Sequence, residues 1–160
     1  MARHKILVSG ETRYPRYAAR LVKKSIRTAL MCEGVNVSCE VNVLFTDDNG
    51  IQSLNRELRQ VDRPTDVLSF PAFSFVPERF DPQDGEFDPE SGRLPLGDMA
   101  LNLDCIRQQG TEYGTGEKRE TAYLTVHSIL HLLGYDHMDE GEQKKQMRRR
   151  EDEIMKVMKL

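Results

Sequence analysis

The sequence predicts an α+β fold, a small mixed four-stranded sheet with about five helices packed on it. Alternating apolar residues over 35–45 are typical of a strand with one buried face. Apolar stripes of helical period occur on both sides of this stretch, and the connections have both hairpin and crossover lengths. The 160 residues show no internal repeat and no second core, so we expect one domain over 1–160.

The first strand and the first helix follow from local patterns near the N-terminus. Residues Lys5–Ser9 alternate weakly between apolar and polar side chains, which indicates a strand. Pro15 suits a first helical turn because its missing N–H has no helical partner there, so a helix is expected to open at Tyr14. An apolar stripe runs along this helix, and Gly34 is placed to end it.

The middle of the chain predicts a strand, a helix and a further strand. The alternating stretch Val35–Phe45 is expected to be a long strand. Polar residues at 46–48 can cap a helix that runs to about Arg59, with apolar residues spaced along one face. A polar loop follows, and Asp66–Phe70 has the composition of a short strand that Pro71 stops.

The second half of the chain predicts a long loop, a strand and three helices. Residues 74–95 contain four prolines among acids and glycines, which indicates an irregular loop. Leu96–Leu103 is expected to be a strand, and Asp104 is placed to cap a short helix that reaches about Gln109. Glu117–Leu133 is strongly apolar and predicts a buried central helix, whereas Glu142–Met158 is amphipathic.

Composition places the chain among globular proteins without a membrane span. Hydrophobic residues make up 38% of it and charged residues 31%, and no apolar run approaches the ~20 residues of a membrane helix. The first residues become polar too quickly for a secretory signal. The cysteines (Cys32, Cys39 and Cys105) are scattered and odd in number, which fits free thiols in a reducing compartment. We therefore expect a cytoplasmic protein.

Charge is distributed unevenly along the chain. The net charge is −3, which by itself argues against a general nucleic-acid binder. Residues 1–31, however, carry eight basic side chains and a single acid, and residues 78–104 carry eight acids and two arginines. A local basic face is able to follow a phosphate backbone despite the acidic total, although a solvated helix surface explains the same pattern equally well.

The segment from His127 to His137 holds three of the four histidines of the chain. His127 and His131 are four residues apart, so a helix projects both from one face. Gly134 can end that helix in a left-handed conformation, which turns His137 back toward the first two. Three imidazoles supply three of the four tetrahedral positions of one zinc ion and leave the fourth for water. We therefore predict a metal site of His127, His131 and His137 at the end of a central helix.

The histidine spacing also matches the long zinc-peptidase motif H-E-x-x-H-x-x-G-x-x-H, with one decisive difference. Ser128 stands where a peptidase has the glutamate that acts as general base. A hydroxyl has no useful basicity near neutral pH, whereas zinc lowers the pKa of its bound water to about 7. The pattern thus favours metal-assisted hydrolysis of a bond other than a peptide, and a metzincin-like zinc peptidase is an alternative.

Three segments together resemble the YbeY family of bacterial metal-dependent endoribonucleases. The segments are Leu54-Asn55 with Arg59 and Pro64–Pro71, then Leu96–Asp98, then His127–His137. The matching part extends over about residues 40–140. Ser128 departs from the glycine that is more common in the family, but both residues are small.

The resemblance implies a single-strand-specific endoribonuclease that uses one zinc ion in the cytoplasm. It also implies maturation of the 3′ end of small-subunit (16S) ribosomal RNA and ribosome quality control, with single-stranded RNA, ribosomal RNA or the small ribosomal subunit as partners. Arg59 matches the family's arginine and is the candidate for stabilising charge on the phosphoryl oxygens. The candidate catalytic set is then Arg59, His127, His131 and His137. Either a water molecule or the RNA 2′-OH can be the attacking group.

Several points stay open in the sequence. Asp136 is placed to orient an imidazole or to shape the turn, with the structural roles favoured, and Asp66 and Asp98 suit either orienting roles or caps and turns. A non-catalytic, ribosome-associated metal-binding factor that uses the basic helix at 15–30 is the alternative to an enzyme. Nickel, copper and cobalt also fit a three-histidine site, and the sequence does not define an oligomeric state.

Overall fold

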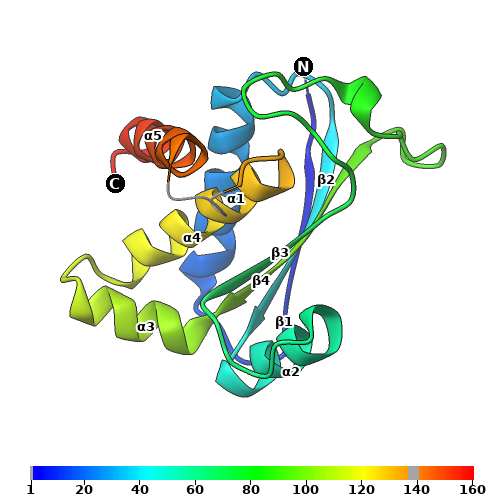
Figure 1. The fold of residues 1–160 in the computed structure, drawn as a ribbon. Helices are drawn as coiled ribbons and strands as arrows, with labels where there is room; N and C mark the ends of the chain where they lie inside the picture. Colours follow the sequence, from blue (N-terminus) through cyan, green and yellow to red (C-terminus); the bar gives the residue numbers. More distant parts are fainter. Residues whose placement is uncertain (1, 137–140) are drawn as a thin grey trace.

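The computed structural model describes residues 2–136 and 141–160. Within them the chain forms a four-stranded mixed sheet with helices on both faces (Figure 1), which confirms the predicted α+β fold. The strand order is β1–β2–β4–β3. The strands are β1 (Lys5–Gly10), β2 (Cys39–Thr46), β3 (Val67–Pro71) and β4 (Leu94–Asn102). The first two pairs in this order are parallel, and β3 is antiparallel to β4.

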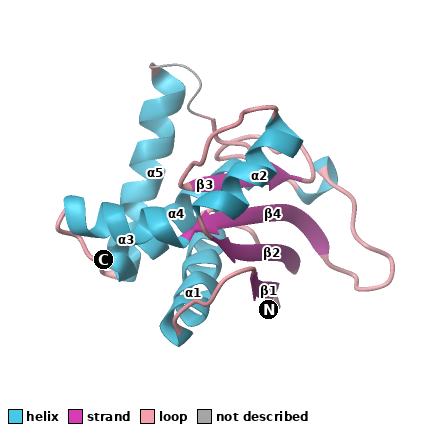
Figure 2. Cartoon of the chain, turned by 90° about the horizontal axis from the view of Figure 1, so that it is seen from below, coloured by secondary structure: helices cyan, strands magenta, loops and turns pink. Residues whose placement is uncertain are grey.

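The helices divide between the two faces of the sheet (Figures 1 and 2). On one face, α1 (Arg16–Cys32) and α4 (Glu117–Leu132) pack side by side, and α5 (Glu142–Met158) packs against both. On the other face, α2 (Asp48–Arg59) covers a smaller apolar cluster. Helix α3 (Leu103–Glu112) continues directly from β4 and contacts α4. Because successive strand residues point to opposite faces, the alternation of Val43 and Leu44 supplies both cores.

Helix α4 is the centre of the larger core. Its side chains are buried on almost every side, including Leu124, Val126 and Ile129. A helix of this kind belongs to the interior, as the sequence predicts, because it has no wide polar face to offer to water. It therefore places its last two turns, with His127 and His131, at a fixed position relative to the sheet.

Local signals explain where two of the helices begin. The side chain of Asp47 accepts a hydrogen bond from Gly50 N at 2.9 Å and caps α2, as expected from the polar run at 46–48. The prediction that Asp104 caps α3 was wrong. The cap is Asn102, whose side-chain oxygen accepts from the N–H groups of Asp104 and Cys105. The helix begins at Leu103, so Asp104 already lies in its first turn and the side chain of Asn102 bonds the free N–H groups there.

Two strand boundaries differ from the prediction. Strand β2 begins at Cys39 rather than Val35, because its partners extend no further: Cys39 pairs with Leu94, the first residue of β4. Strand β4 in turn begins at Leu94, inside the stretch expected to be a loop. The prediction placed the start of β4 after Pro95, because a proline in a strand cannot donate the hydrogen bond of its missing N–H. In the structure Pro95 lies where the register between β4 and β2 shifts, and a proline is tolerated at such an irregularity.

The loop between β3 and β4 is longer than any other connection and contributes to the core. Phe75 is buried, and a short 3-10 helix forms at Pro82–Asp84. No helix within the described ranges is long and apolar enough to cross a lipid bilayer.

Candidate functional site

A cleft of about 580 Å³ opens beside the C-terminal end of α4. Its walls come from the end of α2, from β3 with the loop that follows it, and from the last turn of α4. The lining residues are Arg59, residues 65–69, Pro71, residues 73–75, His127, His131 and residues 134–136. Two of the three predicted metal ligands and the predicted arginine thus line one cleft.

The two histidines of α4 face each other one helical turn apart. Their Nε2 atoms are 3.1 Å apart. The ring centroids are 4.7 Å apart, with the ring planes at 79°. This is the arrangement that the i, i+4 spacing of His127 and His131 predicted. His137, the third predicted ligand, lies outside the described residues. Within residues 2–136 and 141–160, no three His, Cys, Asp or Glu side chains are grouped to hold a metal ion.

The other ring nitrogen of each histidine is next to a hydrogen-bond acceptor. His127 Nδ1 lies 2.5 Å from Oε2 of Glu151, and His131 Nδ1 lies 3.0 Å from the main-chain oxygen of Tyr135. A carboxylate and a carbonyl only accept hydrogen bonds, so each Nδ1 atom is the donor. In a neutral imidazole a proton on Nδ1 leaves the lone pair on Nε2. Both Nε2 lone pairs are therefore on the nitrogens that face each other.

This arrangement fits a bound cation. Two nitrogen lone pairs that face each other at 3.1 Å repel unless positive charge lies between them. Two nitrogens that each lie ~2.0–2.1 Å from one tetrahedral zinc ion are roughly 3.3 Å apart. The separation of the two Nε2 atoms is close to that value, so this pair of imidazoles is suited to be two ligands of one metal ion.

The turn after α4 is built around Gly134 and Tyr135. Gly134 has a φ of +100°, which confirms the predicted change of backbone direction at this glycine. Tyr135 N donates to the carbonyl of Leu130 at 3.0 Å, so the turn folds back on the helix end. The same turn presents the Tyr135 carbonyl to His131 and places Asp136 in the wall of the cleft.

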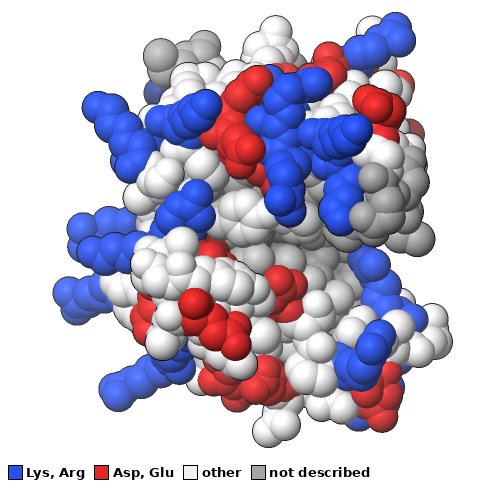
Figure 3. Space-filling model, turned by 60° about the vertical axis from the view of Figure 1, so that its left-hand side comes forward, with Lys and Arg blue, Asp and Glu red and all other residues white. Residues whose placement is uncertain are grey.

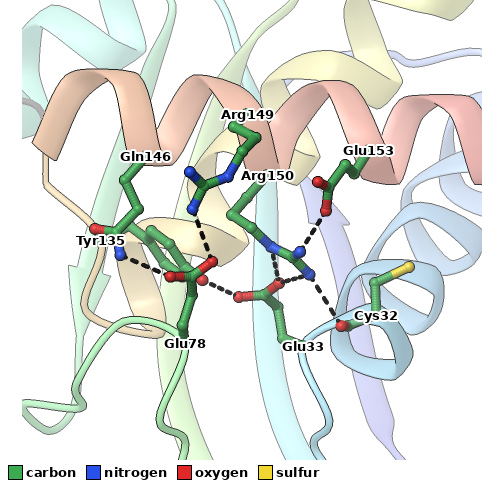
Figure 4. Close-up of polar contacts among 8 residues, drawn as sticks. All are labelled: Cys32, Glu33, Glu78, Tyr135, Gln146, Arg149, Arg150 and Glu153. Atoms are coloured by element: carbon green, nitrogen blue, oxygen red, sulfur yellow. Dashed lines mark hydrogen bonds and ion pairs between the residues drawn. The ribbon is translucent and has the colours of Figure 1, made fainter. Parts of the chain in front are cut away.

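A buried ion pair holds the Tyr135 side chain (Figure 4). The Tyr135 hydroxyl donates to the Glu33 carboxylate at the end of α1. Arg150 of α5 donates to the other oxygen of that carboxylate, with Nε at 2.7 Å and Nη2 at 2.5 Å, and also to the Cys32 carbonyl at 3.0 Å. Burial, together with the hydrogen bond to Glu33, raises the pKa of Tyr135, so its hydroxyl stays a donor. The turn beside the histidines is thus fastened to both α1 and α5.

Arg59 is held in the wall formed by β3. Its guanidinium donates to the main-chain oxygen of Ser69 and lies 5.3 Å from the centre of the Phe70 ring. The hydrogen bond to Ser69 fixes the Arg59 side chain at the cleft. It uses only part of the guanidinium, which has five N–H donors.

Ser128, at the position of the peptidase glutamate, is fully buried and its hydroxyl is bonded to Ser69. The predicted acids separate into two groups. Asp66 and Asp136 line the cleft, whereas Asp98 is exposed on the sheet and accepts a hydrogen bond from Asn42 at 2.9 Å. Asp98 therefore has a structural role between β2 and β4.

The sequence reasoning missed Glu151. It lies on α5 and is brought to His127 only by the packing of α5 on α4. One signal was present: Glu151 falls on the buried stripe of that helix together with Met147, Ile154 and Met158. A carboxylate on an apolar stripe is costly unless it is bonded, which marks it as a residue with a partner.

Charged side chains are unevenly spread over the face that Figure 3 shows. Lys and Arg project along its left-hand edge, both charges mix in its upper part and at its lower right, and Asp and Glu predominate at the lower left, below a largely uncharged hollow. The basic residues of α1 belong to its solvent face, because its other face, with Val22, Ile26 and Leu30, packs in the core.

The fold and the cleft define an α+β protein whose mixed sheet is covered by helices on both faces, with a histidine pair presented near the end of its central helix. Comparison with known proteins then gives the family: residues 9–159 match the model of Endoribonuclease YbeY, and the chain belongs to the YbeY family. The Endoribonuclease YbeY of Clostridium acetobutylicum is 48% identical over 142 residues, which cover 84% of each chain. That of Clostridium botulinum (strain Loch Maree / Type A3) is 45% identical over 149 residues and 87% of each chain.

A solved structure supports the fold. The solution structure of a Thermotoga maritima protein superposes with a TM-score of 0.59 at 23% identity, covering 96% of this chain and 91% of that one. At this identity the likeness concerns the fold alone.

Proposed function

We propose that this protein is a metal-dependent endoribonuclease that cleaves single-stranded RNA, with one zinc ion held by His127, His131 and His137. Membership of the YbeY family supports the endoribonuclease activity. The proposal of a metal ion rests on one observation: the Nε2 atoms of His127 and His131 are 3.1 Å apart, and the Nδ1 atom of each ring is hydrogen-bonded to an acceptor. His137 follows the turn that Gly134 opens and is the third ligand in this proposal.

The alternatives are not favoured. A metzincin-like peptidase needs a base at the position of Ser128, and that side chain is buried and bonded to Ser69. A non-catalytic, ribosome-associated metal-binding factor would account for the histidine pair, but not for its place in a cleft with Arg59 or for membership of an endoribonuclease family. The endoribonuclease proposal accounts for the cleft, the histidines and Arg59 together.

Each residue of the cleft has a distinct task in this proposal. When bound, zinc supplies Lewis-acid activation of a phosphoryl oxygen and lowers the pKa of water. His127 and His131 present Nε2 lone pairs because Glu151 and the Tyr135 carbonyl hold their Nδ1 protons. Arg59 binds the non-bridging phosphoryl oxygens with the donors that Ser69 does not use, and stabilises their charge.

The substrate follows from the family resemblance and from the cleft. We propose the 3′ end of small-subunit ribosomal RNA as the biological substrate, with a role in ribosome quality control in the cytoplasm. The cleft is bordered by the half-buried ring of Phe73 as well as by polar groups, and aromatic rings stack on unpaired bases. An RNA duplex buries its base faces, so this lining suits a single strand.

A cleavage assay tests the proposal. Protein freed of metal by a chelator is incubated with end-labelled RNA, single-stranded or annealed to its complement, before and after addition of zinc. We expect cleavage of the single strand only, lost without metal and restored by zinc. His131→Ala should lose zinc and cleavage together, whereas His4→Asn, which changes a histidine outside the cleft, should retain both. Full cleavage with stoichiometric zinc in His131→Ala would overturn the site, and cleavage of a peptide instead of RNA would overturn the activity.

A further inference from the structure

Glu151 is a buried carboxylate in an apolar setting. It is only 3% exposed and lies on the stripe of α5 that also buries Met147, Ile154 and Met155. Taking a carboxylate out of water costs free energy unless its oxygens are hydrogen-bonded. A stability role alone is better served by an apolar side chain at this position, so the contacts of Glu151 indicate what it does.

Both oxygens of Glu151 are used, and both partners are on α4. Oε2 lies 2.5 Å from His127 Nδ1, and Oε1 accepts from the Tyr123 hydroxyl at 3.0 Å. Tyr123 lies one turn before His127, and their ring centroids are 6.3 Å apart. Burial and the Glu151 carboxylate raise the pKa of Tyr123, so the phenol stays protonated and donates. One oxygen is thus fixed by Tyr123, which directs the other at the histidine.

The helix that carries Glu151 is itself anchored. The preceding residue, Arg150, reaches in another direction to the Glu33 carboxylate, which also accepts from Tyr135 (Figure 4). In the same figure, Arg149 and Gln146 hold the two oxygens of Glu78 at 3.1 and 3.0 Å, which joins α5 to the long loop. A group that positions another must sit on a rigid support, and these contacts supply it.

We propose that Glu151 is a positioning residue that fixes His127 in the tautomer with its proton on Nδ1, so that the Nε2 lone pair is directed at the cleft. A carboxylate guarantees this tautomer, because it accepts and never donates. A glutamine of the same shape presents an oxygen or an NH₂ group, and the NH₂ group selects the opposite tautomer. The importance of this for zinc binding rests on the function proposed above, whereas the tautomer itself does not.

The tautomer is measured directly by ¹⁵N NMR of the metal-free protein with labelled histidine, at alkaline pH where imidazole is neutral. We expect a protonated Nδ1 and an unprotonated Nε2 for His127. Glu151→Gln should give a mixture of both tautomers. Tyr123→Phe keeps the carboxylate and should retain the wild-type tautomer. A proton on Nε2 of His127 in the wild type, or an unchanged tautomer in Glu151→Gln, would overturn the proposal.

Zinc affinity, measured by competition with a chelating dye, tests the consequence. Glu151→Gln should weaken zinc binding by about 10–100-fold, the usual effect of removing a group that orients a ligand. Asp152→Asn makes the same chemical change at the neighbouring exposed position and should leave the affinity unchanged. Circular dichroism establishes that each variant is folded. If Glu151→Gln does not fold, Tyr123→Phe decides: a shift of its tautomer to Nε2–H overturns the proposal.

The two proposals fail in different ways. A wild-type protein that shows the Nδ1–H tautomer but binds no zinc would contradict the proposed function and leave the positioning role in place. A wild-type protein that binds zinc and cleaves RNA, with the same affinity and tautomer in Glu151→Gln, would contradict the positioning role alone.

Discussion

The hydroxyl oxygens of Ser69 and Ser128 lie 2.7 Å apart in the interior and join strand β3 to helix α4. Ser128 is fully buried and follows His127 directly, and Ser69 is also buried. The main-chain oxygen of Ser69 accepts from Arg59. This pair of serines therefore connects the wall that holds the arginine to the helix that holds the histidines.

Removing one of the two serine hydroxyls leaves the other buried without its partner. We expect Ser128→Ala to lower the free energy of unfolding by about 1–3 kcal/mol, the cost of an unsatisfied buried polar group. The double variant Ser69→Ala/Ser128→Ala should cost less than the sum of the two single variants, because no polar group is left unpaired. Urea unfolding of all four proteins measures this coupling. Strictly additive losses would show that the two hydroxyls do not depend on each other.

Gly134 is required by the close approach of two segments. A Cβ added at Gly134 would lie 2.0 Å from the main-chain oxygen of Phe75, and the φ of +100° already disfavours other residues. Gly92 has a φ of +72° but open space around it, so Gly92→Ala is a matched control for the backbone cost alone. That cost is about 1–2 kcal/mol.

We expect Gly134→Ala to be destabilised by clearly more than Gly92→Ala in urea unfolding, because the turn and the loop must separate. This displaces the turn that presents the Tyr135 carbonyl to His131, so zinc binding should weaken in the folded fraction as well. Equal losses of stability in the two variants would show that the contact with Phe75 is not tight.

Predictions from the sequence succeeded where the information is local. The i, i+4 spacing placed His127 and His131 on one face of α4, and Gly134 ended the helix, because both features depend only on helix geometry. The prediction that β2 starts at Val35 was wrong, because the start of a strand depends on contacts between distant segments. The alternation from Val35 onward has the strand period, but a strand exists only where a partner runs beside it, and β4 begins opposite Cys39.

The same distinction applies to the site. Arg59 could be selected only through the family resemblance, since nothing in its local sequence shows that the end of α2 reaches the cleft. Glu151 and Ser69 are brought to the helix by packing between segments distant in sequence. Such contacts leave only indirect traces in a single sequence, such as an acid on the apolar stripe of α5.

The buried pair of Glu33 and Arg150 gives a third prediction. The Glu33 side chain is 4% exposed and that of Arg150 18%. Glu33→Gln leaves Arg150 with only the half-exposed carboxylate of Glu153 as a counter-charge, so we expect a loss below the about 3–5 kcal/mol of a fully broken buried pair, reduced further by the partial exposure of Arg150. Tyr135→Phe removes one hydrogen bond to a charged acceptor and should cost about 1.5–3 kcal/mol.

A double variant separates the ion pair from simple packing. Glu33→Gln/Arg150→Met should be more stable than Glu33→Gln alone, because no uncompensated charge remains near the interior. Thermal and urea unfolding provide the values. If Arg150→Met further destabilises Glu33→Gln, the guanidinium stabilises the fold mainly through its contacts with the Cys32 carbonyl and Glu153.

The Cys105 thiol gives a prediction about pH. Burial raises its pKa from 9.0 to about 11, with smaller contributions from the nearby carboxylates of Asp48, Asp66 and Asp104. A raised thiol pKa disfavours the thiolate, so at neutral pH its thiolate fraction should be about 100-fold lower than that of a thiol with the ordinary value.

Alkylation of Cys105 by iodoacetamide, measured by peptide mass spectrometry, should rise with pH up to about 11 in the folded protein. In urea-unfolded protein the same curve should level off at the ordinary pKa, and Asp66→Asn should move the folded curve only slightly, because burial is the main cause. A folded curve that coincides with the unfolded one would show that Cys105 is not shielded.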